Sequence, residues 1–427
     1  MTGETIFALS SGAPPAAIGI IRVSGPHAAG ALARLTGKPL PQPRKAVLRT
    51  LRSGDGALLD QALVLHFPGP DSATGEDLVE LHCHGGRGVV AAVERALGEL
   101  PGCRRAQPGE FTRRAFANGR IDLAEAEGLG DLLAAETELQ RQAAVGLLEG
   151  RFSAQVDRWR ETLLRLSAML EAALDFADDD GAGDLPPQFA AELDTLTGEL
   201  DTWLRQPRSE RLKEGVRVVI AGPPNSGKST LFNALVEDEA AITSPEAGTT
   251  RDALDRHVAL SGVPFTFVDT AGLREEGAGT IEAIGIARAR QHMGRADLVL
   301  WLGPEGEGPA GALEIDPRID EPEHRPKRRP DLGVSGLTGE GVAALKTLLL
   351  ERARELLPRP GSVALNRRQA LLLEEARLAL RSAGSATDDL VKAEHLRQAR
   401  LAFDRLLGRS ATEDMLDALF GRFCIGK

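Results

Sequence analysis

The sequence predicts a multidomain protein of the α+β and α/β classes, with an α/β domain inserted into a helical one. Its 427 residues suggest roughly three domains at about 150 residues each. Short apolar runs alternate with helical patterns at the start of the chain and again after about residue 216. A long proline-free stretch of helical periodicity separates these two parts, so helices lie between the two expected sheets.

The composition is that of a folded protein. Hydrophobic residues make up 42% and charged residues 26%, which excludes wholesale disorder. The net charge of −11 argues against nonspecific polyanion binding, which needs clustered Lys and Arg, although a local basic patch stays open. Cys83, Cys103 and Cys424 form no Cys-x-x-Cys pair, so we expect reduced thiols. No apolar run approaches a membrane span of about 18 residues and the first residues lack a signal pattern, so we expect a cytoplasmic protein.

Residues 1–118 predict an N-terminal α+β domain. Its β-rich runs cover residues 17–23, 61–67 and 77–82, with helical patches between them. His82 and His84 lie on one face of the last run, where they form either a packed strand end or, less readily, part of a metal site.

The predicted helical domain is discontinuous and comprises residues 119–213 and 357–427. No proline occurs between Pro108 and Pro186, and apolar residues recur at steps of three or four from Leu148 to Leu174. This spacing predicts one long amphipathic helix. Its apolar stripe needs partners, which we expect in residues 189–204 and in the stretch that begins at Asn366.

Residues 214–356 predict the inserted α/β domain. The apolar runs 217–221 and 297–301 are typical of parallel strands that are covered on both faces. The segment from Pro304 to Pro330 is rich in proline and mixed charges, which predicts a surface loop rather than a core element.

A phosphate-binding loop, Gly222-Pro-Pro-Asn-Ser-Gly-Lys-Ser229, follows the first of these strands. Gly222 and Gly227 let the backbone turn its N–H groups toward phosphate oxygens at a helix N-terminus. Lys228 would neutralise the β and γ phosphates and Ser229 would bind Mg²⁺. The remaining residues expected to bind GTP in this loop are Asn225, Ser226 and Thr230.

Further nucleotide-binding motifs follow along the chain. Asp269 ends an apolar strand and can hold the Mg²⁺ water shell, and the amide of Gly272 can meet the γ-phosphate. Thr250, in Gly248-Thr-Thr-Arg-Asp252, can complete the metal shell when a γ-phosphate is present, which predicts a switch element. Thr249 beside it is also expected to bind GTP.

The base-recognition motif departs from Asn-Lys-x-Asp. The nearest segment is Pro317-Arg-Ile-Asp320, in which Asp320 can accept both guanine N–H donors while Arg318 stacks on the base. Ser335, Gly336 and Leu337 stand where a loop contacting guanine O6 would follow, before a helix near Gly341. We expect guanine rather than adenine, bound with reduced affinity.

The residue after Asp-x-x-Gly is Leu273, which cannot orient the attacking water as glutamine does. Another group must take this role. Glu282 is the nearest carboxylate in a structured context, although Glu275 and Glu276 are closer in sequence. Asn225 suits a monovalent cation placed where the charge of an arginine finger would lie.

Taken in order, the motifs resemble the MnmE (TrmE) family of tRNA modification GTPases over essentially the whole chain. The resemblance rests on the phosphate loop, on Asp269-Thr-Ala-Gly-Leu-Arg274 and on the tail Phe423-Cys-Ile-Gly-Lys427. The N-terminal segments that agree are Ile21–Gly25, Thr74–Asp77, His84–Gly86, Pro108–Phe111 and Asn118–Leu123.

This resemblance implies a potassium-dependent GTPase that works with the flavoprotein MnmG (GidA). Together they would form 5-carboxymethylaminomethyl or 5-aminomethyl groups on the wobble uridine of tRNA, with 5,10-methylenetetrahydrofolate supplying the carbon and 5-formyltetrahydrofolate as an analogue. The implied fold is an N-terminal folate-binding domain that forms a homodimer, a helical domain in two segments and an inserted Ras-like domain.

The resemblance also implies roles for particular residues. The water-orienting carboxylate maps to Glu282, and the thiol of the modification reaction maps to Cys424. Folate contacts map to Arg22, Glu80, Arg120 and Lys427. Potassium contacts map to Asn225, Ser244, Glu246 and Thr249, of which Ser244 is also expected to contact GTP.

Two alternatives stay open. The chain could be an RNA-associated or ribosome-assembly switch GTPase without folate chemistry, or a non-hydrolysing folate-binding scaffold. The pairs Arg113-Arg114 and Arg367-Arg368 either touch tRNA phosphates or form solvated helix faces.

Overall fold

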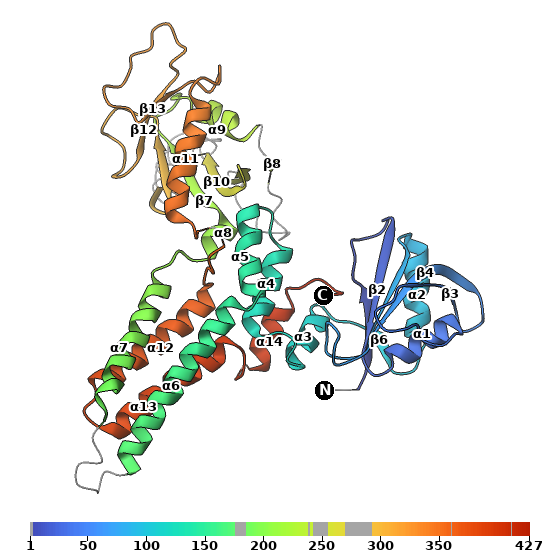
Figure 1. Cartoon of the computed structure of the whole chain (residues 1–427). Helices are drawn as coiled ribbons and strands as arrows, with labels where there is room; N and C mark the ends of the chain where they lie inside the picture. Colours follow the sequence, from blue (N-terminus) through green and yellow to red (C-terminus); the bar gives the residue numbers. More distant parts are fainter. Residues whose placement is uncertain are drawn as a thin grey trace, which may run out of the picture. The chain divides into compact units, whose positions relative to one another are not determined.

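The computed structural model describes residues 3–175, 185–237, 240–241, 255–269, 293–359, 361–410 and 412–427, without the side chains of residues 240, 241 and 269. The chain forms two compact units (Figure 1). One unit is Met1–Gly130 with Asp404–Lys427, and the other is Asp131–Phe403. The four-part domain division made from the sequence stays a prediction.

The first unit is built on a six-stranded sheet in the order β3-β4-β5-β2-β1-β6. Neighbouring strands are antiparallel except for β1 and β6, which are parallel. The three runs that the sequence predicted as strands are confirmed as β2, β4 and β5. The strands are β1 Thr5–Leu9, β2 Ile18–Ser24, β3 Val47–Arg52, β4 Leu58–Phe67, β5 Leu78–His84 and β6 Cys103–Arg105.

Helices α1 (Ala28–Thr36) and α2 (Arg87–Gly98) cover one face of this sheet. Apolar side chains of both helices pack with alternate residues of the strands into one core. The opposite face leaves Ile18, Leu48 and Leu63 exposed at 56%, 60% and 47%. On this second face Ile6 and Ala8 of β1 are buried together with Phe111, so the face is open over β2, β3 and β4 but covered at β1.

The end of the chain returns to the first unit. Leu123 packs with Phe420 and Phe423 in a small core of α4 and α14. Helices α4 and α13 run from one unit into the other. The helices of this part are α3 Glu110–Ala117, α4 Leu123–Leu133 and α14 Glu413–Phe420, whereas α13 Asp389–Leu406 belongs mostly to the second unit.

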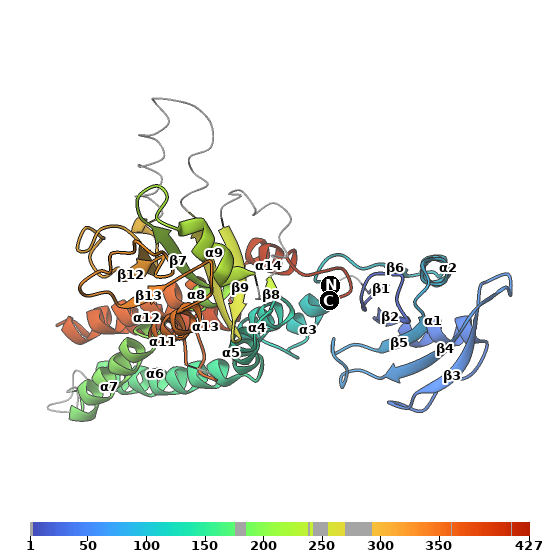
Figure 2. The ribbon, with the colours of Figure 1, turned by 90° about the horizontal axis from the view of Figure 1, so that it is seen from above.

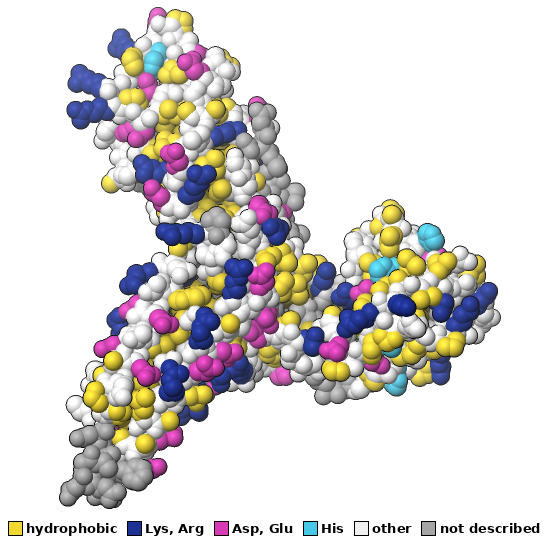
Figure 3. Space-filling view, in the orientation of Figure 1, with side chains coloured by type: hydrophobic (Ala, Val, Ile, Leu, Met, Phe, Trp, Pro, Cys, Tyr) yellow, Lys and Arg dark blue, Asp and Glu magenta, His cyan; other side chains and the backbone are white. Residues whose placement is uncertain are grey.

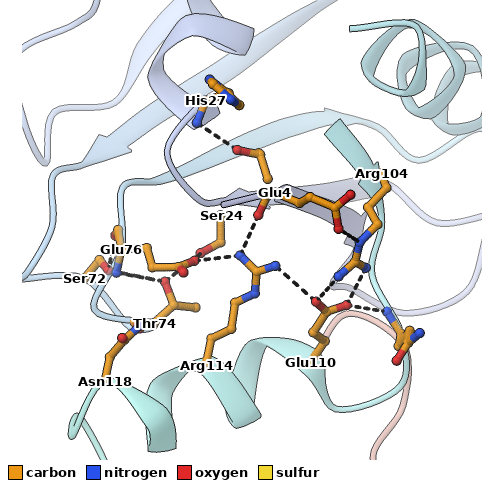
Figure 4. A network of polar contacts seen from close by, with 12 residues as sticks. Glu4, Ser24, His27, Ser72, Thr74, Glu76, Arg104, Glu110, Arg114 and Asn118 are labelled. Atoms are coloured by element: carbon orange, nitrogen blue, oxygen red, sulfur yellow. Dashed lines mark hydrogen bonds and ion pairs between the residues drawn. The ribbon is translucent and has the colours of Figure 1, made fainter. Parts of the chain in front are cut away.

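A buried ion network fixes α3 to the sheet (Figure 4). Arg114, which is 7% exposed, donates to Glu76 at 2.9 Å, to Glu110 at 3.1 Å and to the Glu4 carbonyl at 3.0 Å. Arg104 donates to both oxygens of Glu110, at 2.6 Å to the Oε1 that Arg114 also binds and at 2.8 Å to Oε2. The carboxylates of the Thr74–Asp77 and Pro108–Phe111 motifs therefore hold the fold together.

Because the Glu110 carboxylate is paired in the folded protein, we expect its contribution to the stability of the first unit to depend on pH. Burial acts to raise its pKa, but hydrogen bonds from Arg104, the Gln107 N–H and Arg114 outweigh burial and lower the pKa below its ordinary 4.5. Because the folded pKa is lowered, this stability is present above pH 4.5 and is lost as pH falls through the folded value. We expect Glu110→Gln to cost about 1.5–3 kcal/mol at pH 7, measured by urea unfolding.

The difference from wild type should shrink below pH 4.5. Glu99→Gln, an exposed carboxylate in the same unit, is the matched control and should change little at any pH. A difference between Glu110→Gln and wild type that stayed constant down to pH 3 would contradict the assignment.

In the second unit, helices α6, α7, α12 and α13 lie side by side (Figures 1 and 2). The Trp159 ring lies edge-on to Trp203 and stacks on Phe403, which joins α6 to α7 and α13. The partners predicted for the long amphipathic helix are therefore confirmed. The helices are α5 Glu138–Leu148, α6 Arg151–Asp175, α7 Pro187–Leu204 and α12 Arg367–Ser385.

The predicted start of that long helix was wrong. Leu148 is the last residue of α5, and α6 begins only at Arg151. Gly150 adopts φ 70° between them, a left-handed conformation that interrupts a helix. The apolar residues keep the same helical spacing across this break, so their spacing alone does not reveal it.

The rest of the second unit contains a seven-stranded sheet in the order β13-β12-β11-β7-β10-β9-β8. The strands from β13 to β10 are parallel, and β9 and β8 are antiparallel to their neighbours. Helix α11 begins at Val342, as predicted. The elements are α8 Glu210–Glu214, β7 Val216–Ala221, α9 Lys228–Val236, β8 Ala240–Ala241, β9 Asp255–Leu260, β10 Val263–Asp269, β11 Leu298–Trp301, β12 Leu313–Pro317, β13 Leu332–Val334 and α11 Val342–Leu356.

The prediction that Pro304 to Pro330 forms only a surface loop was wrong. Strand β12 lies within this segment, and Ile315 is fully buried in the core. The opposite face of the strand is polar and paired, because Lys327 binds Glu314 at 2.7 Å and His324 binds Asp316 at 3.0 Å. These charges gave a buried strand the composition of a loop. Within the described residues, every helix is too short or too polar to cross a lipid bilayer.

Candidate functional site

The phosphate-binding loop joins the central strand β7 to α9. Gly222 adopts φ 155°, and a Cβ there would lie 2.9 Å from Ser226 Oγ and 3.1 Å from the Leu302 carbonyl carbon. Asn225 and Gly227 both have positive φ, at 59° and 91°. The loop is therefore wound tightly around the N-terminus of α9, which is the geometry that presents backbone N–H groups to an anion.

Lys228 is held inside this loop. Its Nζ donates to the carbonyls of Pro223 at 2.6 Å and Gly222 at 3.1 Å, and the residue is only 8% exposed. Ser229 and Thr230, the next residues of α9, are exposed. Ser226 Oγ is buried and has no hydrogen-bond partner among the described residues. These groups fit a Mg²⁺-bound triphosphate: the ammonium group of Lys228 is held in place, the hydroxyls of Ser229 and Thr230 are exposed, and Ser226 Oγ is available for a hydrogen bond.

The base-recognition segment reaches the same loop. A guanidinium nitrogen of Arg318 donates to the backbone carbonyl of Asn225, and Arg318 also pairs with Glu321 at 3.2 Å. Asp320 is exposed two residues further on. The structure therefore places the predicted base-binding residues beside the phosphate loop, with the tip of Arg318 on that loop.

The segment Ser335–Leu337 lies against the first turns of α9. A Cβ on Gly336 would come within 2.8 Å of the Leu231 nitrogen and 2.9 Å of the Thr230 carbonyl carbon, so only glycine fits this approach. The Ser335 side chain accepts hydrogen bonds from the N–H groups of Leu337 and Thr338, which closes the turn. These contacts bring the segment close to α9, and the predicted contact with guanine O6 stays a prediction.

The remaining nucleotide-site residues lie partly outside the described structure. The Asp269 backbone pairs with Ile220 at the end of β7, so it lies at the edge of the sheet where the phosphate loop begins. The residues outside the described part are Ser244, Glu246, Thr249, Thr250, Gly272 and Glu282.

A second polar cluster lies on the open face of the first sheet. Arg22 and Glu80 face each other across β2 and β5 and are joined at 3.0 and 3.2 Å. His82 binds the other oxygen of Glu80 at 3.2 Å, and Arg22 lies 5.9 Å from the centre of the Phe111 ring. The sequence predicted Arg22 and Glu80 as members of this site. It did not predict that His82 contacts Glu80 and that Phe111 lies beside Arg22, because these contacts depend on strand register.

Opposing effects act on the Glu80 carboxyl. Burial acts to raise its pKa, but hydrogen bonds from His82 and Arg22 outweigh burial and keep the pKa below its ordinary value. Glu80 is therefore an ionised acceptor at neutral pH. Its side chain keeps 18% exposure and that of Arg22 keeps 25%, so both can be reached from the open face.

Arg120 and Lys427 do not join this cluster directly. Among the described residues, no hydrogen bond or ion pair links either of them to Arg22 or Glu80. The stem of Arg120 lies near Gly75, where an added Cβ would be 3.3 Å from Arg120 Cγ. Thr74, next to that glycine, bonds Ser24 at the end of β2, so Arg120 is tied indirectly to the strand that carries Arg22.

The tail that carries Cys424 packs on the first unit. Ile425 forms a β-bridge with Pro108, and the Gly109 N–H donates to the Cys424 carbonyl at 3.4 Å. A Cβ on Gly426 would come within 2.1 Å of the Leu9 carbonyl oxygen, so the tail lies directly against the end of β1. The Cys424 side chain is exposed.

The cysteines and histidines of β5 form no metal site. His84 binds Asp60 at 2.7 Å, whereas His82 binds Glu80. In the described ranges, no group of three or more His, Cys, Asp or Glu residues is placed to hold a metal. Cys83 is buried in the core on the opposite face of β5, and burial followed by the charge of Asp60 raises its pKa to about 12. The His84 side chain is 74% exposed, so the strand end is packed at Cys83 and partly at His82 but not at His84.

Comparison with known proteins covers nearly the whole chain. A protein-family model described as the N-terminus of the GTP-binding protein TrmE matches residues 5–120. A second family model, the MnmE helical domain, matches residues 123–424. A tRNA modification GTPase MnmE of Erythrobacter litoralis is 63% identical over 99% of this chain and 100% of its own length. One from Novosphingobium aromaticivorans is 62% identical, with the same coverage.

Among solved structures, the G domain of the T. maritima FeoB iron transporter is 25% identical and covers 32% of this chain and 98% of its own. Its TM-score of 0.22 is too low to carry an argument. The chain belongs to the MnmE family of tRNA modification GTPases.

Proposed function

We propose that the protein hydrolyses GTP and acts in tRNA modification. The main support is a wound phosphate loop with Lys228 held inside it, in a chain that is 63% identical over its length to a tRNA modification GTPase. Deleting the gene and analysing the nucleosides of its tRNA tests the proposal. Loss of a modified wobble uridine is expected, and unchanged tRNA nucleosides would contradict it.

Within this function, we assign the hydrolysis roles as follows. Lys228 and the N–H groups of the loop hold the phosphates, while Ser229 and Thr250 bind Mg²⁺ with Asp269 on its water shell. Glu282 orients the attacking water. A potassium ion on Asn225 adds positive charge where the transition state needs it, and Ser244, Glu246 and Thr249 complete its surroundings. The left-handed backbone of Asn225 supports this, because it turns the residue at the rim of the loop.

The potassium assignment has a direct test. GTP turnover is measured for wild type and Glu282→Ala in KCl and in NaCl. We expect wild type to be faster in KCl, and Glu282→Ala to be slow in both salts. Equal rates in all four combinations would contradict both the ion and the carboxylate.

The open-face cluster suits a reduced folate. Glu80 is an ionised acceptor for N–H donors of a pterin, and the cations Arg22, Arg120 and Lys427 suit a glutamate tail. When bound, the folate would supply the one-carbon group. Cys424, the proposed thiol of the modification reaction, lies in the same structural unit as this cluster. Calorimetry with 5-formyltetrahydrofolate tests the site, since Glu80→Gln should abolish binding. Absence of heat with wild type would favour a switch GTPase without folate chemistry.

We also propose a homodimer and a complex with the flavoprotein MnmG. The exposed Ile18, Leu48 and Leu63 lie on the open sheet face that carries Arg22 and Glu80, and this face supports pairing with a second copy. Light scattering of the purified chain tests the dimer. Leu48→Lys should then yield monomers that still hydrolyse GTP.

A further inference from the structure

Two basic segments, far apart in sequence, meet in the second unit where the chain enters and leaves the part that contains the seven-stranded sheet. The first is residues 205–213 and the second is residues 352–368. Each contains one acidic residue, Glu210 and Glu355 respectively. The cations are Arg205, Arg208, Arg211 and Lys213 in the first, and Arg352, Arg354, Arg359, Arg367 and Arg368 in the second. For a chain with a net charge of −11, this is a marked local excess of positive charge.

Backbone contacts hold the two segments together. The N–H of Ser209 donates to the Leu365 carbonyl at 3.0 Å, and the N–H of Arg367 donates to the Glu210 carboxylate at 2.5 Å. An open cavity of about 560 Å³ lies between them. Figure 3 shows Lys and Arg side chains gathered around the place where Figure 1 labels α8. Four arginines line the cavity: Arg205, Arg208, Arg211 and Arg367.

Two of these guanidinium groups have weak or neutral partners. Arg205 donates to the Thr202 hydroxyl at 3.2 Å, and Arg211 reaches the Leu356 carbonyl at 3.5 Å and Asp297 at 3.6 Å. Such contacts hold the side chains at the rim without neutralising them fully.

The other two guanidinium groups, of Arg208 and Arg367, form no ion pair with any carboxylate in the described part of the chain. The acids of the cavity are already engaged in part. Glu210 accepts the Arg367 N–H through one oxygen, while its other oxygen is buried without a hydrogen-bond partner among the described residues, and Glu355 lies 3.8 Å from Arg352. The cavity therefore keeps an excess of positive charge that an anion can neutralise.

We propose that this cavity binds phosphates of the tRNA backbone through Arg208 and Arg367. The planar guanidinium fork matches the geometry of phosphate oxygens, and neutralising phosphates releases counterions, which drives binding. Four of the nine residues that line the cavity are arginines and two are glutamates, so its net charge is positive and suits a polyanion. The inference rests on the proposed function, which supplies tRNA as the partner.

The test compares two double variants of the full chain. Arg208→Gln with Arg367→Gln removes the proposed contacts. Arg325→Gln with Arg329→Gln is the matched control, because these arginines are exposed in the loop between β12 and β13 and have no carboxylate partner among the described residues. Binding of fluorescein-labelled unfractionated tRNA is measured by anisotropy, in KCl from about 50 to 200 mM.

We expect the cavity variant to bind tRNA about tenfold more weakly at the lowest salt, with a salt slope reduced by about 1.4 to 1.8, as loss of two phosphate contacts requires. The control should stay within about twofold of wild type, and GTP turnover should be unchanged in both. Arg208→Lys with Arg367→Lys keeps the charges and should retain most of the slope, which separates loss of contact from misfolding.

Unchanged affinity and slope in the cavity variant would overturn the inference, and so would an equal loss in the control. If wild type hydrolyses GTP but does not bind tRNA, the proposed function itself fails. If wild type and the cavity variant bind tRNA equally well, this inference alone fails.

Discussion

Replacing Lys228 by alanine is expected to lower GTP turnover about 100- to 1,000-fold, the usual cost of removing a preorganised group that stabilises transition-state charge. Its Nζ is fixed by two carbonyls of the phosphate loop and is almost fully buried, so no reorganisation is needed when charge develops on the phosphates. Neighbouring side chains cannot replace it, because Ser229 and Thr230 carry no charge. Steady-state phosphate release with saturating GTP and Mg²⁺ measures the effect.

Lys45→Ala is the matched control, since Lys45 is exposed in the other unit and contacts nothing in the phosphate loop. We expect its turnover to equal that of wild type. Circular dichroism should show that Lys228→Ala is folded. A Lys228→Ala rate within about tenfold of wild type would refute the assigned role of this lysine.

Arg114→Met should destabilise the first unit by about 3–5 kcal/mol, because removing one partner of a buried ion network leaves charges without compensation. The variant has similar volume but cannot donate to Glu76, Glu110 or the Glu4 carbonyl. Arg104 still binds both oxygens of Glu110, whereas among the described residues the Glu76 carboxylate keeps the hydroxyl of Ser24 as its hydrogen-bond partner. Urea unfolding at pH 7, followed by the loss of secondary structure, measures the change.

The neighbouring residue supplies the control. Arg113 pairs with Glu413 and with Asp417 of α14, but its side chain is 35% exposed and these acids are more exposed still. Arg113→Met should therefore cost no more than about 1 kcal/mol. Equal losses in the free energy of unfolding for the two variants would show that burial of the network does not determine how much it contributes to stability. Arg114 is buried in this network rather than on a solvated helix face, whereas a contact of Arg113 with tRNA stays a prediction.

Strand β12 shows how sequence patterns fail where charges are paired. Its buried face carries Leu313 and Ile315, but the residues between them are Glu314 and Asp316. Lys327 and His324 reach these acids from a loop that follows the strand. A pattern of apolar and charged residues between prolines indicates a loop unless those distant partners are known.

The folate site stays a prediction, but the structure shows which contacts of its residues the sequence could not predict. Arg22 and Glu80 were named from motifs, and strand register does place them side by side. His82 was recognised only as a strand-end histidine, because its bond to Glu80 depends on two side chains of β5 pointing to the same face. Residues two apart on a strand share a face, but sequence alone does not say which face stays open.

The sequence by itself determined the phosphate loop, the strand-to-helix context around Lys228 and the helical partners of α6, because glycine positions and apolar spacing are local properties of a chain. Only the tertiary structure decided that the Cys424 tail packs against β1, that Arg318 reaches the Asn225 carbonyl and that two basic segments meet around one cavity. Each of these contacts joins residues that are distant in sequence. Their geometry is set by packing and hydrogen bonding of the whole fold, which no local pattern specifies.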